Sequence, residues 1–259
     1  MKQVRAKKSL GQHFLCDEEI AARIASVITG LPGDAARWNG IPVLEVGPGM
    51  GVLTKYLMEQ NRPLTCVELD SESVEYLSKA YPSLKVIEAD FLKMNLADVY
   101  PGEFALIGNY PYNISSQIFF KVLDNKERIP VVAGMLQKEV AERICSGPGS
   151  KAYGILSVFL QAWYDCEYLF DVGPEVFSPP PKVRSGVLRL TRNSRTELGC
   201  DPVLFKKVVK TAFGMRRKTL RNSLAGILPP GFDDPALLAL RPERLGVEDF
   251  ISLTKRIQG

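Results

Sequence analysis

Four consecutive residues, Asn109-Tyr110-Pro111-Tyr112, have the side-chain types that could activate an aromatic amine. The lone pair of an exocyclic amine such as that of adenine is delocalised into the ring. Two acceptors on its N–H groups, the Asn109 side-chain oxygen and the Tyr110 carbonyl, would draw the nitrogen towards tetrahedral geometry and free the lone pair. Pro111 would fix the turn, and Tyr112 would stack on the base, a contact worth about 1–3 kcal/mol. Taken alone, an N-x-P-Y sequence is more often a plain surface turn.

A glycine-rich motif, Glu45-Val46-Gly47-Pro48-Gly49-Met50-Gly51, lies about sixty residues earlier and follows an apolar run. It predicts a turn from a strand into a helix that begins at Val52, where glycines let a ligand approach the backbone. Glu68 follows Gly47 by about twenty residues, the separation at which a carboxylate meets ribose hydroxyls in such folds. Asp90 closes the next predicted strand, where the adenine of a ligand could reach it.

Both NAD and S-adenosylmethionine fit this spacing. Pro48 lacks the backbone N–H that a pyrophosphate would need, and Glu45 places negative charge beside that position. A sulfonium carries positive charge and no phosphate, so it suits an acid-rich pocket of Glu45, Glu68 and Asp90. We therefore predict S-adenosylmethionine as the cofactor and methyl transfer to adenine. Alignment of the amine with the methyl group would supply most of the catalysis, and no general base is required.

Short apolar runs rich in β-formers alternate with amphipathic helical stretches between residues 42 and 190. We predict strands at residues 43–46, 64–69, 85–89, 104–108, 131–136, 166–172 and 186–190. The first five, each followed by a helical segment, predict a parallel, doubly wound, Rossmann-like α/β sheet. The last two could form an antiparallel hairpin at its edge. The Asn109 motif would then lie at the carboxyl edge of the sheet, where ligands of such folds bind.

Strand-like runs end near residue 194, and helices are predicted at residues 202–213, 218–225, 234–239 and 247–257. We divide the chain into a methyltransferase domain, residues 1–194, and a basic helical domain, residues 195–259. Residues 182–259 carry 16 Lys and Arg against 7 Asp and Glu, although the whole chain is only +4. A local excess of this kind favours a polyanionic partner, and a solvated helix face is the plain alternative.

Other classes of protein fit the composition poorly. The five cysteines are far apart and never form a C-x-x-C pair, so we expect neither disulfides nor a metal site. The basic start has no apolar run like that of a signal peptide, and no apolar stretch approaches the ~20 residues that span a bilayer. We expect a cytoplasmic protein with no membrane partner, acting as a monomer. The single histidine, His13, is more simply structural than catalytic.

The chain resembles, over nearly its whole length, the ribosomal RNA adenine N6,N6-dimethyltransferases, specifically the KsgA type that acts on small-subunit rRNA. The markers are Gln12-His13-Phe14-Leu15, the glycine motif, Glu68, Ala89-Asp90, Asn109-Tyr110-Pro111-Tyr112, Phe177-Ser178-Pro179-Pro180-Pro181-Lys182-Val183 and residues 213–224. The chain departs from the family at Tyr110, where Leu is usual, and at His13, where Asn is common. Both departures are harmless if these residues contribute only backbone atoms.

The resemblance implies a function and a set of site residues. The substrate would be two adjacent adenines in the 3′-terminal hairpin loop of 16S rRNA, each dimethylated at N6 on a small-subunit particle during its biogenesis. The cofactor site would comprise Gln12, His13, Leu15, Glu45, Gly47, Gly49, Glu68, Asp90 and Asn109. The acceptor site would comprise Asn109, Tyr110, Tyr112 and Phe177, with Phe177 beside the target base. We prefer an active-site loop around Phe177 to a stiff proline linker.

The basic cluster Arg216, Arg217, Lys218 and Arg221 is predicted to open a helix of the second domain. It would bind phosphate rather than read sequence, although a solvated helix face is a reasonable alternative.

Two other functions remain open, and a third, methylation of adenine in DNA, is disfavoured by the motif. An antibiotic-resistance relative that methylates large-subunit rRNA has a similar catalytic domain, but residues 213–224 favour the small-subunit type. DNA adenine methyltransferases have acidic or Pro-Pro versions of the Asn109 motif. A non-catalytic assembly factor would not need Glu68, Asp90 and Asn109 intact.

Overall fold

A computed structural model describes residues 4–7 and 10–259, and its contacts divide the chain into two compact units. The first comprises Met1–Ala141 and Asp165–Arg192, and the second comprises Glu142–Tyr164 and Asn193–Gly259. The sequence-based domains differ from this division, because they place residues 142–164 and 193–194 in the first domain. Aromatic side chains explain the difference, because the ring of Phe159 lies 6.0 Å from that of Phe205 in the second unit.

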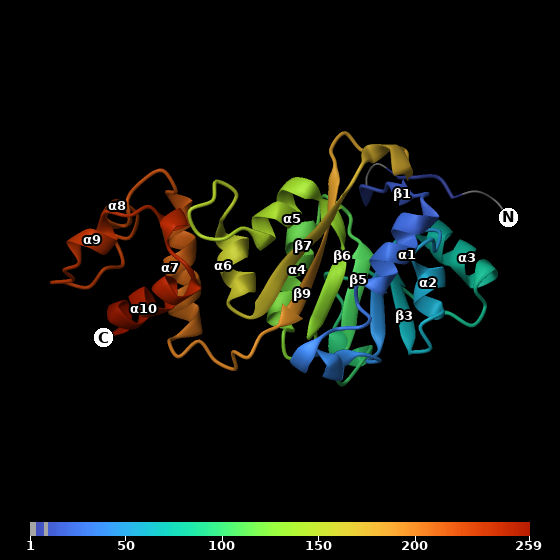
Figure 1. Cartoon of the computed structure of the whole chain (residues 1–259), viewed down its shortest axis with the longest axis horizontal. Coiled ribbons are helices and arrows are strands. Elements are labelled where there is room, and N and C mark those ends of the chain that lie inside the picture. The colour runs from blue at the N-terminus through green and yellow to red at the C-terminus, as the bar shows by residue number, and fades with distance from the viewer. Residues whose placement is uncertain (1–3, 8–9) are drawn as a thin grey trace. The chain divides into compact units, whose positions relative to one another are not determined.

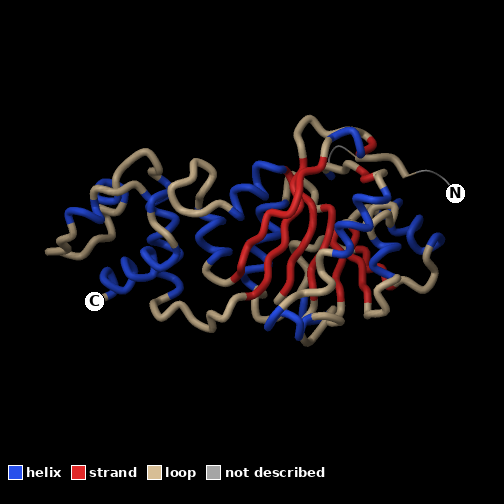
Figure 2. The backbone as a smooth tube through the Cα atoms, viewed as in Figure 1, coloured by secondary structure: helices blue, strands red, loops and turns tan. Residues whose placement is uncertain are grey.

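A seven-stranded sheet forms the centre of the first unit, with the order β4-β3-β2-β5-β6-β9-β7 (Figures 1 and 2). Its strands are β2 (Val43–Val46), β3 (Leu64–Glu68), β4 (Lys85–Glu88), β5 (Ala105–Asn109), β6 (Val131–Gln137), β7 (Tyr164–Val172) and β9 (Ser185–Arg192). Strands β2 to β6 pair in parallel, which confirms the predicted parallel sheet. Strand β9 pairs antiparallel with β6, and β7 lies beyond it at the edge.

The strand order places a ligand crevice between β2 and β5. From β2 the chain moves outward through β3 to β4, and it then returns to continue on the other side with β5 and β6. Right-handed crossovers in opposite directions place helices on both faces of the sheet. The carboxyl ends of β2 and β5 therefore border the point where the winding reverses, which is where such sheets bind ligands.

The helices of the first unit differ in detail from the predicted pattern. They are α1 (Glu18–Ser26), α2 (Thr54–Met58), α3 (Ser71–Ala80) and α4 (Ser115–Asp124), with short 3₁₀ helices at Gly33–Trp38, Leu96–Asp98 and Pro174–Val176. The helix after the glycine motif begins at Thr54 rather than Val52, because Gly51 and the two residues after it still form turns. The helical segment predicted between β4 and β5 is only the short 3₁₀ helix Leu96–Asp98, with no α-helix beside it.

A two-stranded antiparallel sheet joins two segments that are far apart in sequence. Strand β1 (Phe14–Leu15) pairs with β8 (Phe177–Ser178), with Phe14 opposite Ser178 and Leu15 opposite Phe177. The Cys16 N–H extends the pairing by donating to the Val176 carbonyl over 2.8 Å. Strand β8 lies in the predicted loop between the last two strands of the large sheet, and its pairing brings that loop to residues 14–16.

Helices make up the second unit. They are α6 (Ile155–Gln161), α7 (Pro202–Gly214), α8 (Leu220–Ser223), α9 (Pro235–Leu238) and α10 (Val247–Gln258), with a 3₁₀ turn at Pro242–Arg244, and α5 (Lys138–Cys145) begins in the first unit. Asp201 caps α7, because its carboxylate accepts from the Val203 N–H, and the apolar face of α7 packs on α10 through Phe213 and Phe250. The four predicted helices are present, with α8 shorter than expected.

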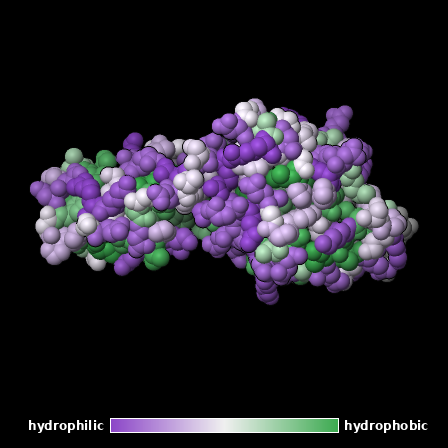
Figure 3. All heavy atoms as spheres, turned by 90° about the horizontal axis from the view of Figure 1, so that it is seen from below, coloured by the Kyte–Doolittle hydropathy of each residue, from purple (hydrophilic) through white to green (hydrophobic). Residues whose placement is uncertain are grey.

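The face in Figure 3 is mostly hydrophilic in both units, with apolar residues exposed in small groups. Within residues 4–7 and 10–259, no helix is long and apolar enough to cross a bilayer.

Candidate functional site

A cavity of about 470 Å³ opens at the carboxyl ends of β2 to β5. Its lining comes from residues 10–16, the glycine motif, the ends of β3 and β4, and the turn after β5. Of the residues predicted for the cofactor and acceptor, the lining contains Gln12, His13, Leu15, Glu45, Gly47, Gly49, Glu68, Asp90, Asn109, Tyr110 and Tyr112. Phe177 is not among them.

The glycine motif forms a tight turn in which Gly49 has a positive φ of 56°. A Cβ atom on Gly49 would lie 2.9 Å from a ring carbon of Phe14, so glycine is required both by the conformation and by the close packing of β1. The Gly49 N–H points into the site and donates to the Glu68 carboxylate over 3.1 Å.

Glu68 organises the centre of the cavity from the end of β3. Its Oε2 accepts from the Gly49 N–H, and its Oε1 accepts from the N–H groups of Leu69 and Asp70 over 2.8 and 2.9 Å. Burial raises the pKa of Glu68, while these three backbone donors oppose the shift by favouring the ionised form. The carboxylate therefore ties the glycine turn to the turn between β3 and α3.

Glu45 lies deeper, on β2, and is only 1% exposed. Burial raises its pKa to about 7, and the Cys66 thiol donates to its Oε2 over 3.4 Å. The buried Glu45 carboxyl group thus retains its proton more readily than a solvent-exposed glutamate. A cationic ligand beside it would favour the ionised form.

The raised pKa of Glu45 predicts a pH-dependent cost in stability. A glutamate in the unfolded chain has a pKa near 4.5. The protonated Glu45 therefore contributes its full stabilisation below pH 4.5, and this contribution is lost as the pH rises from 4.5 through about 7. We expect Glu45→Gln to be more stable than the wild type at pH 8, on the order of 3 kcal/mol, and to have no such advantage at pH 4.5. Urea unfolding of both proteins at the two pH values, without cofactor, tests this. A difference between the proteins that does not vary with pH would contradict it.

Asp90 follows β4 and begins a turn. Its Oδ1 accepts from the Leu92 N–H over 2.9 Å, and Lys93 lies 3.4 Å from Oδ2. Lys121 of α4 holds the same turn, because its ammonium donates to the carbonyls of Leu92 and Met94 over 3.0 and 2.6 Å. The side chain of Asp90 is about one-third exposed and can still meet an adenine amine.

Asn109 ends β5 with its side chain in a defined orientation. Its Nδ2 lies 3.1 Å from the His13 carbonyl, which can only accept, so the amide nitrogen must face β1. The amide oxygen is then directed away from that contact, as an acceptor for a substrate amine.

The two tyrosines of the acceptor motif have different environments. Tyr110 is 1% exposed, and its hydroxyl donates to the Ala133 carbonyl of β6 over 2.7 Å, so only its backbone can serve the site. Tyr112 is partly exposed, with its ring stacked on the His13 imidazole at 5.6 Å between centroids and its hydroxyl 2.6 Å from Ser185 Oγ. The His13 Nδ1 donates to the Pro179 carbonyl over 2.8 Å, since a carbonyl cannot donate. The side chain of His13 thus has a structural partner, in addition to the contact that its backbone carbonyl makes with Asn109.

Phe177 lies elsewhere than expected. It is 4% exposed and belongs to the hydrophobic core with Leu15 and Val172, rather than lining the cavity beside Tyr112. The β1–β8 pairing explains the difference, because it turns the Phe177 ring inward while its neighbour Ser178 remains exposed.

A second cavity, of about 500 Å³, lies wholly within the second unit. Arg216 and Arg217 line it. The other charged residues of the lining, which sequence reasoning missed, are three cations, Lys151, Arg241 and Arg244, and one acid, Glu243. The Arg216 guanidinium donates to the Lys151 carbonyl over 2.6 Å. Lys218 and Arg221 are exposed outside the lining. Arg216, Arg217 and Lys218 precede α8 in a turn instead of opening the helix, whereas Arg221 lies within α8.

Two other missed residues, Lys7 and Asp70, form an ion pair beside the first cavity, with Lys7 Nζ 2.5 Å from Asp70 Oδ1. The sequence Asp70-Ser71-Glu72 could have revealed Asp70 as a helix cap. Lys7 has no local signal, because its partner is 63 residues away.

Comparisons with known proteins agree over nearly the whole chain. A family model described as "Ribosomal RNA adenine dimethylase" matches residues 3–256. The chain is 59% identical to the ribosomal RNA small subunit methyltransferase A of Parabacteroides distasonis over 258 residues, which cover 98% of this chain and 94% of that one. It is 56% identical to the protein of that name from Porphyromonas gingivalis over 264 residues, with both chains fully covered.

Solved structures show the same fold. A dimethyladenosine transferase from Plasmodium falciparum has a TM-score of 0.76 at 23% identity, with 93% of this chain and 96% of that chain covered. The 23S rRNA methyltransferase ErmE has a TM-score of 0.68 at 27% identity, with 95% and 100% covered.

Proposed function

Because the chain belongs to the ribosomal RNA adenine dimethylase family, we propose that it dimethylates the N6 amines of two adjacent adenines in the 3′-terminal hairpin loop of 16S rRNA, with S-adenosylmethionine as the methyl donor. The small-subunit particle or its precursor is the proposed partner, and the cytoplasm is the proposed location. A single chain is the proposed acting unit.

One observation carries this proposal, namely that the cofactor residues and the acceptor motif share one cavity at the carboxyl edge of the sheet. The cavity suits S-adenosylmethionine, because its lining contains Glu45, Glu68 and Asp90 and no lysine or arginine among the described residues. When bound, that cofactor supplies an electrophilic methyl group on a cationic sulfur. Glu68 would hold the ribose hydroxyls while it keeps Gly49 in place.

The acceptor residues would act on the amine through position and hydrogen bonding. The Asn109 amide oxygen and the Tyr110 carbonyl would accept from its two N–H groups, which frees the nitrogen lone pair. The ring of Tyr112 would stack on the extruded base, which requires His13 to yield its place or to stack on the other face. No protein base is needed, because the methylated amine can release its proton to solvent.

The basic cavity of the second unit is the proposed site for rRNA phosphates, with Arg216 and Arg217 joined by Lys151, Arg241 and Arg244. Several cations around one concave site attract a polyanion more strongly than the same charges spread over a surface. Lys218 and Arg221, which are exposed outside this cavity, remain proposed contacts of the same partner.

Loss of two cavity arginines should weaken particle binding and reduce its salt dependence. For Arg217→Gln with Arg244→Gln, we expect the slope of log K against log salt to fall in magnitude by about 1.5, because two phosphate contacts are lost. Binding to 30S particles at several salt concentrations measures the slope. Lys207→Gln with Lys210→Gln removes the same charge from exposed positions of α7 outside the cavity and serves as the matched control. An unchanged slope in the first variant would remove the cavity from the RNA footprint.

The function itself is tested by transfer of labelled methyl groups from S-adenosylmethionine to 30S particles that lack the modification, followed by nucleoside analysis. We expect N6,N6-dimethyladenosine in 16S rRNA. The likeness to ErmE supports a second candidate, methylation of large-subunit rRNA, so 23S rRNA is tested in parallel. Label in 23S rRNA alone would favour that candidate, and particle binding without transfer would favour a non-catalytic assembly factor.

A further inference from the structure

The segment made of Lys7 and residues 10–16, here called the clasp, contacts both halves of the first cavity. Residues 10–16 line the cavity, and Phe14 and Leu15 form β1, which pairs with β8. Asn109 of the acceptor motif donates to the His13 carbonyl. The position of the clasp therefore sets the shape of the site on the cofactor side and on the acceptor side.

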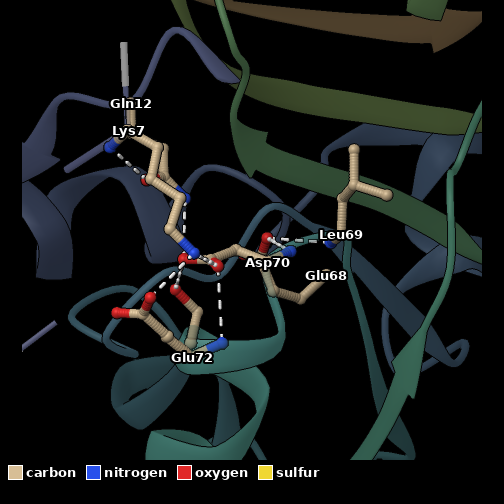
Figure 4. Close-up of polar contacts among 7 residues, drawn as sticks. Lys7, Gln12, Glu68, Leu69, Asp70 and Glu72 are labelled. Atoms are coloured by element: carbon tan, nitrogen blue, oxygen red, sulfur yellow. Dashed lines mark hydrogen bonds and ion pairs between the residues drawn. The ribbon is translucent and has the colours of Figure 1, made fainter. Parts of the chain in front are cut away.

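Lys7 ties the start of the clasp to the turn that carries Glu68 (Figure 4). Its ammonium lies 2.5 Å from Asp70 Oδ1 and 3.1 Å from Glu72 Oε1. The Gln12 amide adds a bond of 3.3 Å to Asp70 Oδ2, and its own oxygen accepts from the Lys7 N–H over 2.8 Å. A backbone hydrogen bond also links the two parts of the clasp, because the Leu10 N–H donates to the Lys7 carbonyl over 3.0 Å.

Asp70 makes this contact stronger than an ordinary surface ion pair. Its side chain is 1% exposed, whereas that of Lys7 is 34% exposed. Burial alone would raise the pKa of Asp70, but the bonds from Lys7, Gln12 and Ser73 hold it below its ordinary value, so the buried carboxylate is ionised and needs a cation. Its remaining bonds are to the Ser73 hydroxyl and to the Glu72 N–H at the start of α3.

Asp70 is also one residue removed from the cofactor cavity. The Asp70 N–H donates to Glu68, and Leu69 between them lines the cavity with half of its side chain exposed. The ion pair that holds the clasp on Asp70 therefore also helps to fix the positions of Glu68 and Leu69 at the edge of the cavity.

We propose that Lys7 is a positioning residue for the cofactor, which by its ion pair with Asp70 and Glu72 holds the clasp over the cavity. This inference rests on the proposed placement of S-adenosylmethionine in that cavity. Without the ion pair, the clasp would have to be ordered during cofactor binding, and part of the binding free energy would be spent on that ordering.

The variant Lys7→Met tests the proposal, because it retains the aliphatic stem and removes the charge. We expect the Kd values of S-adenosylmethionine and of S-adenosylhomocysteine both to rise by about three- to tenfold, with kcat at saturating cofactor within about twofold of the wild type. Lys7→Arg should restore both affinities. Titration calorimetry gives the Kd values, and initial rates separate KM from kcat.

The comparison of the two ligands distinguishes the clasp from direct electrostatics. S-adenosylmethionine carries the sulfonium charge and S-adenosylhomocysteine does not, so loss of a nearby cation would by itself favour the former. Equal losses for both ligands support the clasp. Tighter binding of S-adenosylmethionine alone, or unchanged Kd values for both, would overturn the proposal.

Two further variants complete the test. Asp70→Asn keeps a capping side chain on α3 but removes the charge, and its effect should not add to that of Lys7→Met, because the two residues form one contact. Lys79→Met removes a lysine 2.5 Å from Glu75 on the exposed face of α3 and should leave both affinities unchanged. Fully additive losses would contradict the proposal. A wild-type protein that binds neither ligand would instead overturn the proposed function.

Discussion

Replacing Asn109 with alanine is expected to lower kcat for methyl transfer by about a hundredfold or more, while binding of 30S particles changes by less than about threefold. The amide oxygen would contact the amine most strongly when its nitrogen becomes tetrahedral, so its loss acts on the transition state rather than on the bound substrate. Loss of one such preorganised group elsewhere costs about 10²–10³ in kcat. Single-turnover transfer to 30S particles and filter binding give the two quantities.

The contact between Asn109 and His13 supplies a control for this experiment. Alanine also removes the 3.1 Å bond to the His13 carbonyl, which could disturb β1. Asn109→Asp keeps the shape and an acceptor oxygen but cannot donate to that carbonyl and adds a negative charge, so it tests loss of the donor while an acceptor is retained. Equal losses of turnover and particle binding in Asn109→Ala would contradict a role in orienting the amine.

Glu68→Ala is expected to raise the Kd of S-adenosylmethionine by about a hundredfold and to destabilise the protein by about 2–4 kcal/mol. The first effect follows from the loss of charge-assisted bonds to the ribose, worth about 1.5–3 kcal/mol. The second follows because the N–H groups of Gly49, Leu69 and Asp70 would lose their acceptor, and buried unpaired donors are costly. Calorimetry and urea unfolding measure the two effects separately.

Two other substitutions sharpen this prediction. Glu68→Gln keeps one acceptor oxygen but presents an amide nitrogen to one of the backbone donors, so we expect a smaller loss of stability and a similar loss of affinity. Glu75→Gln on the exposed face of α3 serves as the matched control and should change neither. A normal cofactor affinity in Glu68→Ala would exclude Glu68 from the site.

The sequence predicted the parallel sheet and the carboxylates at its edge well, because both depend on local pattern. Runs of four or five residues rich in β-formers define β2 and β3, and Glu68 is the last residue of its strand. The helical segment expected between β4 and β5 is a single 3₁₀ turn, because spacing alone cannot separate a 3₁₀ turn from an α-helix. The buried position of Phe177 was missed because it depends on pairing with residues about 160 positions away.

Among the charged residues, too, those adjacent in sequence could be predicted and those brought together only by the fold could not. Arg216 and Arg217 were found as a run of basic residues, whereas Lys151 reaches the same cavity from one other segment, and Arg241 and Arg244 reach it from a single 3₁₀ turn. The partner of Lys7 could not be predicted, because any of several acids could have paired with it.

The packing of Tyr110 restricts the order in which substitutions can accumulate in this chain. A Cβ on Gly134 would lie 2.2 Å from the Gly108 carbonyl and 2.8 Å from the Tyr110 ring, and a Cβ on Gly108 would lie 2.4 Å from the Val46 carbonyl. The two glycines are thus required by the neighbouring backbone, whatever occupies position 110, and their bare surface is what admits a tyrosine ring. Glycine at positions 108 and 134 therefore has to be in place before a tyrosine can be accommodated at position 110. A leucine at position 110 is sterically open to this chain, whereas a side chain at Gly134 is excluded by the Gly108 carbonyl with either residue at position 110.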